Sequence, residues 1–158
     1  MGIIRVITRL KECDMLSCDD VARYFLAKQD EDAGDTISNL KLQKLVYYAQ
    51  GCALALLDRP LFKDPIWAWT HGPVVDSLYH EYKRWEAGAI PPPEDMDFTL
   101  YSHDEREVLD EVYEVYGQFS AWKLRDMTHS EPPWLETPND SIIDQGVMKD
   151  YFKTLVHA

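Results

Sequence analysis

The chain has 158 residues, a formal net charge of −12, and 46% hydrophobic and 12% aromatic residues. This length suits one domain with a self-supporting core, and this composition excludes wholesale disorder. Residues 1–90 carry a net charge of −2 and residues 91–158 carry −10. Because a negative field repels phosphate backbones, direct nucleic-acid binding is disfavoured and a basic partner protein is favoured. A solvated acidic face that keeps the protein soluble is the simpler explanation of the charge taken alone.

The first 14 residues are expected to form an N-terminal extension to a domain that spans residues 15–158. They mix apolar and basic residues, but charge interrupts the apolar run before it reaches the length of an export signal. No later segment approaches the ~20 apolar residues of a membrane span. The three cysteines, an odd number, make no disulfide framework. We therefore expect a cytoplasmic protein without membrane contact.

Local signals predict two helices in the first third of the chain. Ser17 followed by Asp20 resembles a capping box at the start of a short helix. Ser38 can cap a second helix of roughly twenty residues, in which leucine, valine and alanine recur at spacings of three and four. Gly51 lies near the middle of this helix and is unfavourable where a helix is exposed. We therefore expect another element to pack closely against Gly51.

The middle of the chain predicts an extended segment followed by a turn. The bulky run Ile-Trp-Ala-Trp-Thr at 66–70 favours a short strand. His71-Gly72-Pro73 is then expected to turn the chain and to begin a helix that stops near Gly88. Three consecutive prolines at 91–93 force an extended connector.

Further helices are predicted in the acidic half. Ser102 with Glu105 forms another capping-box pattern at the start of a long acidic helix, and Ser120 can begin a shorter one. The Glu-Pro-Pro-Trp segment at 131–134 is expected to break that helix, and a last helix is expected over roughly 142–155. The sum is a mainly α fold, a compact single-domain helical bundle of about six helices with a small β element around residues 61–70.

Two histidines are the candidates for an enzyme site. His71 and His129 each lie beside a turn with acidic residues nearby, and these residue types suit acid and base work. A small hydrolase is therefore one alternative, although no nucleophile elbow, phosphate loop or metal-binding His-Glu helix accompanies them. Simpler roles are a hydrogen bond that fixes the turn for His71 and a helix-end position for His129. Because no such motif accompanies the histidines, we expect no enzyme. Cys13 and Cys18 have no second pair at metal-ligand spacing, so we expect no metal site.

Aromatic residues and two lysines are the other candidates. Lys41 and Lys44 could contact an acidic or phosphate ligand, but they lie off the apolar stripe and are expected on the solvated side of their helix. The aromatic side chains most simply fill the core, although tyrosine and tryptophan are also common binding anchors. These aromatic candidates are Tyr47, Tyr48, Trp67, Trp69, Tyr79 and Trp134.

A series of short stretches resembles one family in order and spacing. It begins with Leu-Lys-Leu-Gln-Lys-Leu at 40–45 and Tyr-Tyr-Ala-Gln-Gly at 47–51, and it ends with Thr-His at 128–129 and Pro-Trp at 133–134. Between them lie Pro-Leu-Phe at 60–62, Ala-Trp at 68–69, Gly-Pro-Val at 72–74 and Leu-Tyr at 78–79. From about residue 15 to residue 152 the chain resembles the Panacea, or SocA-like, antitoxin family, which includes phage-associated GepA proteins. Thr70-His71 departs from its pattern, because relatives more often carry Lys or Arg with an aromatic residue there.

The resemblance implies an antitoxin that neutralises a cognate toxin encoded nearby through direct protein binding. It implies no catalytic residue and no cofactor, and it leaves the toxin's own activity open. One member of the family delivers its toxin to the ClpXP protease, so a proteolytic adaptor is the main alternative. A structural phage or prophage protein is another.

We expect the partner to meet an exposed aromatic patch and the acidic C-terminal half. The candidate partner-binding residues are Lys41, Lys44, Tyr48, Trp69, His71, Tyr79, Glu107, Glu111, His129 and Trp134.

Overall fold

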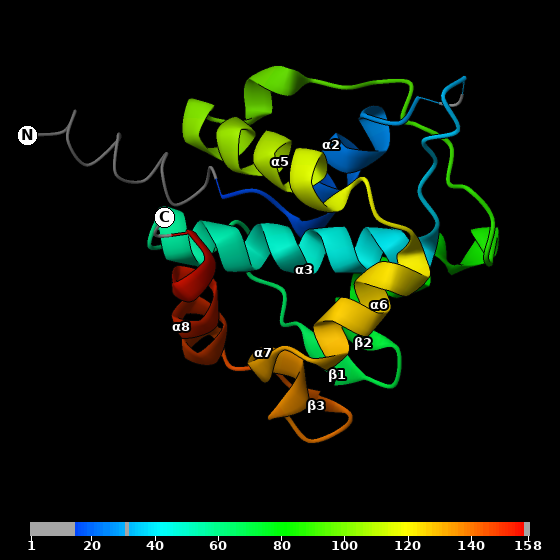
Figure 1. Cartoon of the computed structure of the whole chain (residues 1–158). Coiled ribbons are helices and arrows are strands. Elements are labelled where there is room, and N and C mark those ends of the chain that lie inside the picture. The colour runs from blue at the N-terminus through cyan, green and yellow to red at the C-terminus, as the bar shows by residue number, and fades with distance from the viewer. Residues whose placement is uncertain (1–14, 31, 157–158) are drawn as a thin grey trace, which may run out of the picture.

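The computed structural model describes residues 15–30 and 32–156. The expected N-terminal extension, residues 1–14, and Cys13 within it lie outside the described residues. Over the described residues, seven α-helices and one small antiparallel sheet make a mainly α domain, which confirms the predicted fold class (Figure 1). The elements are α2 Cys18–Ala27, α3 Asn39–Leu56, β1 Trp67–Trp69, β2 Gly72–Val74, α4 Asp76–Tyr82, α5 His103–Tyr116, α6 Ala121–His129, α7 Pro132–Leu135, β3 Ser141–Ile142 and α8 Gln145–Val156, with 3-10 turns at Lys83–Trp85 and Phe98–Leu100.

Helix α3 is the centre of the molecule. Figure 1 shows α2 and α5 on one side of α3, and α6, α7, α8 and the sheet on the other. As a result nearly the whole helix is buried, including its polar residues from Asn39 to Gln50. A helix that is covered on all sides needs a partner for each of its polar side chains. This requirement determines much of the chemistry described below.

The predicted helix starts are confirmed. The Ser17 and Asp20 side chains form both hydrogen bonds of a capping box at α2, and Ser102 and Glu105 do the same at α5. Ser38 caps α3, and Ser120 caps α6 through its hydrogen bond from the Lys123 backbone N–H. Each motif satisfies backbone donors that the first turn of a helix leaves free.

Three boundaries differ from the predictions. Gly72-Pro73-Val74 is strand β2 rather than a turn into a helix, and the helix begins only at Asp76. The segment after Glu131 is itself a short helix, α7, because Pro132 suits the first helical position, where a missing N–H costs nothing. Ile142 lies in strand β3, so the last helix starts at Gln145.

The sheet has the order β2-β1-β3, with both pairs antiparallel. Trp69 pairs with Gly72 at the end of the β1–β2 hairpin, and Trp67 pairs with Ile142 on the other side. The backbone N–H of Asp140 donates to the Ala68 carbonyl at 2.7 Å. The chain before α8 is therefore fixed beside the hairpin.

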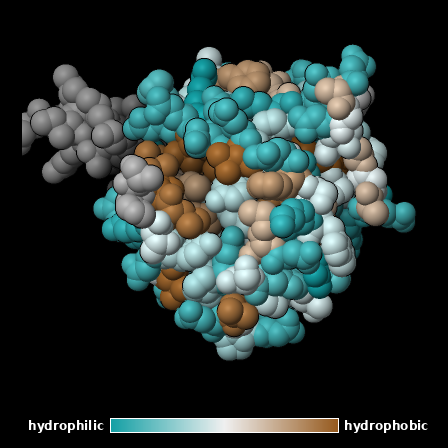
Figure 2. All heavy atoms as spheres, viewed as in Figure 1, coloured by the Kyte–Doolittle hydropathy of each residue, from teal (hydrophilic) through white to brown (hydrophobic). Residues whose placement is uncertain are grey.

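The surface mixes polar and apolar residues. In the view of Figure 2, apolar residues gather where the ends of α3 and α8 meet beneath α5, and Leu56 and Leu155 at these ends are exposed. Among the described residues, no helix combines the length and the apolar character needed to cross a bilayer.

Candidate partner-binding surface

The hairpin, α4 and α6 together present a cluster of exposed and partly exposed aromatic and basic side chains. We call Trp69, His71, Tyr79, Trp122 and Arg125 the hairpin surface. Trp122 is 56% exposed and Tyr79 is 37% exposed. The Arg125 guanidinium lies 4.5 Å from the centroid of the Trp122 ring, and its Nε donates to His71 Nδ1 at 3.2 Å. These contacts hold the Trp122 and His71 rings against Arg125.

A buried lysine of α3 contacts the hairpin. Lys44 has no exposed surface, and its Nζ donates to the Pro73 carbonyl at 3.0 Å. Burial, with a smaller effect from the charge of Arg125, lowers the pKa of Lys44 from 10.5 to about 7. Gly72 has a φ of +106°, and a Cβ there would lie 2.6 Å from Lys44 Cε and 2.8 Å from Thr128 Oγ1. Only glycine permits this conformation and this close approach.

The expectation that Lys41 and Lys44 lie on the solvated side of α3 is wrong. Both are buried, and Lys41 Nζ donates to the Gly117 carbonyl at 2.6 Å. Burial lowers the pKa of Lys41 as well. The reason is that the elements on every side of α3 cover the positions that a two-sided helix would expose. In this structure Lys44 binds a backbone carbonyl of strand β2, and Lys41 binds the carbonyl of Gly117, which follows α5.

A cavity of about 590 Å³ opens beside the hairpin. We call it the hairpin pocket. Its floor contains Asn39 and Gln43, whose polar atoms bond to the protein itself: Asn39 donates to the Tyr79 carbonyl, and Gln43 donates to Asn39 and accepts from the Val75 N–H. Its walls and rim include Leu40, Trp69, His71, Val74, Tyr79, Lys83, Glu86 and Asp140.

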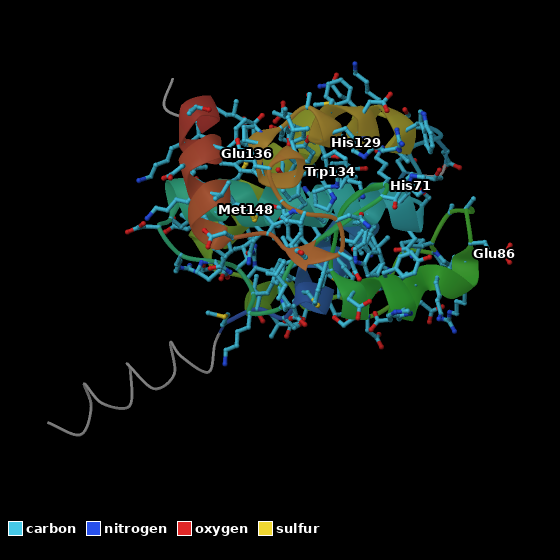
Figure 3. The ribbon with its side chains drawn as sticks, turned by 90° about the horizontal axis from the view of Figure 1, so that it is seen from below. His71, Glu86, His129, Trp134, Glu136 and Met148 are labelled. Atoms are coloured by element: carbon cyan, nitrogen blue, oxygen red, sulfur yellow. The ribbon has the colours of Figure 1, made fainter. Side chains whose placement is uncertain are left out.

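His129 and Trp134 form a stacked pair that contacts strand β1 of the hairpin. Their rings stack with a centroid distance of 4.0 Å and an interplanar angle of 9°, and Trp134 Nε1 donates to the Trp69 carbonyl at 2.7 Å. Figure 3 shows His129, Trp134 and His71 close together on this side of the molecule. Burial is the main cause of a lowered pKa for His129, followed by the charges of Arg125 and Lys44. The pair positions strand β1 and is only partly accessible to a partner.

A buried carboxylate with tyrosine donors joins α3, α7 and α8. The hydroxyls of Tyr47 and Tyr48 donate to the two oxygens of Glu131 at 3.1 and 2.8 Å, and Tyr151 faces the same carboxylate. Glu131 is 7% exposed, and burial raises its pKa to about 7 against the opposing effect of the tyrosines. Tyr48 has no exposed surface and stacks on Tyr116 at 3.8 Å. Sequence reasoning noted Glu131 only as an acidic neighbour of His129, since nothing local shows that three tyrosines converge on it.

The acidic candidates lie apart from the hairpin surface. Glu107 and Glu111 are exposed on α5, which lies across α3 from the hairpin (Figure 1). Glu107 Oε1 lies 2.9 Å from Nε2 of His103, one turn earlier. The predicted site residues therefore do not form one site. Trp69, His71 and Tyr79 lie on the hairpin surface, and Lys44, His129 and Trp134 support it. Glu107 and Glu111 lie on an acidic face across α3, whereas Lys41 and Tyr48 are buried against Gly117 and Glu131.

The thiols and acidic groups in the described residues show no metal-binding arrangement. No group of three or more His, Cys, Asp or Glu side chains in that part of the chain could hold a metal ion. Cys18 and Cys52 are buried free thiols, and burial raises their pKa values to about 11 and about 12. Thiols with such values carry little reactive thiolate near neutral pH.

Comparison with known proteins places the hairpin surface within a recognised domain. The family described as antitoxin SocA-like, Panacea domain, matches residues 42–135, more than half of the chain and all of the hairpin surface. The chain belongs to the SocA-like antitoxin family. It is 32% identical over 116 residues to antitoxin SocA of Caulobacter vibrioides (strain NA1000 / CB15N), an alignment that covers 62% of this chain and 58% of that protein. The chain thus spans less than two thirds of the length of this SocA-like relative, and no solved structure matches it.

Proposed function

We propose that this chain is an antitoxin that neutralises a cognate toxin, encoded nearby, by direct binding through the hairpin surface. The observation that carries the proposal is the exposed Trp122 side chain, held against Arg125 and His71 within the matched domain. Tryptophan and arginine dominate the energetics of protein interfaces, especially when they are pre-organised. The similarity to antitoxin SocA supports the same role. We infer that the functional domain extends over residues 15–158 and acts in the cytoplasm.

Binding, rather than catalysis, is the role that the two histidines support. His71 Nδ1 accepts the hydrogen bond from Arg125, and the ring of His129 is stacked on Trp134. Each therefore has a structural task that accounts for its position. The proposal assigns no catalytic residue and no cofactor to the chain.

The test is neutralisation in a bacterial host. The open reading frame adjacent to the gene for this chain is expressed with the wild-type chain, with Trp122→Ala, or with Phe98→Ala. Phe98 is an exposed aromatic residue that precedes α5 and serves as the matched control. We expect wild type and Phe98→Ala to restore growth and Trp122→Ala to fail, with an affinity loss of at least roughly 30-fold, because a central anchor contributes ~2 kcal/mol or more.

The adaptor alternative is separated in the same experiment by following the neighbour protein itself. Direct neutralisation leaves the toxin level unchanged and yields a stable complex. Growth restored with a falling toxin level, and only while ClpXP is active, would replace blocking by delivery to the protease. A neighbour that is harmless when expressed alone would contradict both.

A further inference from the structure

The hairpin pocket opens beside the hairpin surface and shares Trp69, His71 and Tyr79 with it. Its walls combine apolar surface with two aromatic rings, Trp69 and Tyr79, whose centroids lie 5.4 Å apart at an interplanar angle of 76°. The polar atoms of the floor already bond to the protein, so they offer little to a ligand. An occupant must therefore gain its binding energy from the rings and from charges at the rim.

Three charged residues, Lys83, Glu86 and Asp140, line the rim, and Figure 3 shows the Glu86 side chain turned outward from the molecule. Among the described residues neither Glu86 nor Asp140 has an ion-pair or hydrogen-bond partner for its side chain, and Lys83 is the third charged group. Both acidic residues have positive φ angles, 54° for Glu86 and 62° for Asp140, which non-glycine residues rarely adopt. Asp58, which also has a positive φ, lies outside the pocket and pairs with Lys149. The net charge of the rim is negative, as is that of the chain.

We propose that the hairpin pocket binds an arginine side chain supplied by the protein partner. The guanidinium would stack on the ring of Trp69 or Tyr79, while Asp140 accepts its N–H groups and the exposed Glu86 side chain turns toward the pocket to join it. The identity of that partner as the toxin rests on the proposed function. The pocket has a suitable chemistry whichever basic protein carries the arginine.

An arginine side chain suits this pocket better than an apolar, lysine or acidic side chain does. An apolar side chain would desolvate the rim carboxylates without giving them a partner. Lysine offers a point charge but no plane to stack on an aromatic ring. The chain uses the same contact internally, since Arg125 lies over Trp122 and Arg84 lies 4.9 Å from the centroid of Trp85. An acidic side chain is excluded by the negative rim.

The direct test uses N-acetyl-arginine amide as the probe and N-acetyl-citrulline amide as its uncharged control of equal shape. Binding is followed through the NMR signal of the Trp69 indole N–H, which has no hydrogen-bond partner in the described part of the chain. We expect a saturable shift with the arginine probe and at least roughly tenfold weaker binding of the citrulline probe, because only the guanidinium makes charge-assisted hydrogen bonds and cation–π contacts.

Two variants change the charge of the rim in opposite directions, so an electrostatic effect on arginine binding can be distinguished from damage to the fold. The combined Glu86→Gln and Asp140→Asn variant should weaken arginine binding about fivefold or more, whereas Lys83→Gln should strengthen it roughly twofold, since each exposed pair contributes little. Lys83 is exposed, so its replacement leaves the fold intact. Equal shifts with both probes, or changes in the same direction for all charge variants, would overturn the inference.

A second arm keeps this inference apart from the proposed function. The combined Glu86→Gln and Asp140→Asn variant is titrated with the purified product of the adjacent open reading frame. We expect weaker binding than for the wild-type chain. An unchanged toxin affinity with lost arginine binding would refute the pocket as a toxin contact and leave neutralisation standing. Arginine binding without any toxin complex would support the pocket's chemistry and refute the proposed function.

Discussion

Glu131 is the acidic residue whose surroundings change its chemistry most clearly. Its carboxylate lies between Tyr47 and Tyr48 of α3 and faces Tyr151 of α8, so three hydroxyl groups surround a charge that has little access to water. Burial raises its pKa from the ordinary 4.5 to about 7. The folded state thus binds a proton at Glu131 more tightly than the unfolded state does.

This shift predicts a pH-dependent stability. Because the folded pKa is raised, the contribution of Glu131 is complete below about pH 4.5 and is lost as the pH rises through about 7. Glu131→Gln removes the titration, so the wild-type free energy of unfolding should fall relative to the variant by on the order of 2–3 kcal/mol across this range. Urea unfolding at a series of pH values measures the difference. Glu136→Gln, an exposed change nearby, is the control.

If the free energies of unfolding of wild type and Glu131→Gln changed in parallel with pH, the raised pKa of Glu131 would be contradicted. Other titrating groups, such as Glu81 with a pKa raised to about 7 by its hydrogen bond with Asp19 and by burial, are common to both proteins and cancel in the difference.

Residue environments on α3 illustrate what the sequence could not reveal. Periodicity placed Lys41 and Lys44 opposite the apolar stripe, which is correct for a helix that is covered on one side only. Here α5, α6, α8 and the hairpin cover the remaining sides, and the lysines reach carbonyls of Gly117 and Pro73. Their burial depends on residues 29 to 76 positions away, which no local pattern records.

At the scale of elements, the contact of α3 with α8 organises the core. Gly51 faces the ring of Phe152, and a Cβ at position 51 would overlap that ring. This bears out the expectation that a close neighbour explains a glycine in the middle of a buried helix. The same ring packs edge-on against Tyr47 and Tyr48, so the contact also positions two donors of Glu131.

The contact predicts strong coupling between positions 51 and 152. Gly51→Ala should destabilise the protein by about 1–3 kcal/mol, because overpacking outweighs the gain in helix propensity of about 1 kcal/mol. In a Phe152→Leu background the overlap is relieved, so the same change should be neutral or stabilising. Chemical unfolding of the four proteins gives the coupling energy. Additive effects of the two changes would show that the ring does not limit position 51.

Elements with local signals were predictable, and elements defined by distant pairing were not. The capping boxes at Ser17 and Ser102 depend on residues three positions apart, and sequence reading placed both. Strand β3 exists only because Ile142 pairs with Trp67, 75 positions earlier, and it escaped prediction. Likewise, the hairpin surface needs α6 beside β2, so Trp122 and Arg125 were not among the predicted site residues.

At the scale of the whole molecule, the acidic face of α5 and the hairpin surface lie in different places. The acidic residues of α5 lie across α3 from the hairpin surface (Figure 1), so one small partner is not expected to touch both. We infer that the acidic face attracts a basic partner over distance, whereas the hairpin surface holds it. Long-range attraction of this kind acts mainly on the association rate and weakens with salt.

Charge reversal on α5 tests that division. Replacing Glu107, Glu111 and Glu114 by lysine should slow association with the toxin by roughly tenfold at low salt and leave the dissociation rate nearly unchanged. Asp110 is spared because it accepts a hydrogen bond from Tyr24 and pairs with Lys28. Stopped-flow kinetics at two salt concentrations provides the rates. Unchanged association would remove the acidic face from the account.

The central claim is that the hairpin surface binds the toxin directly. Isothermal titration calorimetry of the purified product of the adjacent open reading frame against wild type, Trp122→Ala and Phe98→Ala tests it most directly. The account predicts a stoichiometric complex for wild type and Phe98→Ala, and a loss of at least roughly 30-fold for a folded Trp122→Ala. A complex of equal affinity for all three proteins, or no complex with the wild-type chain, would contradict it.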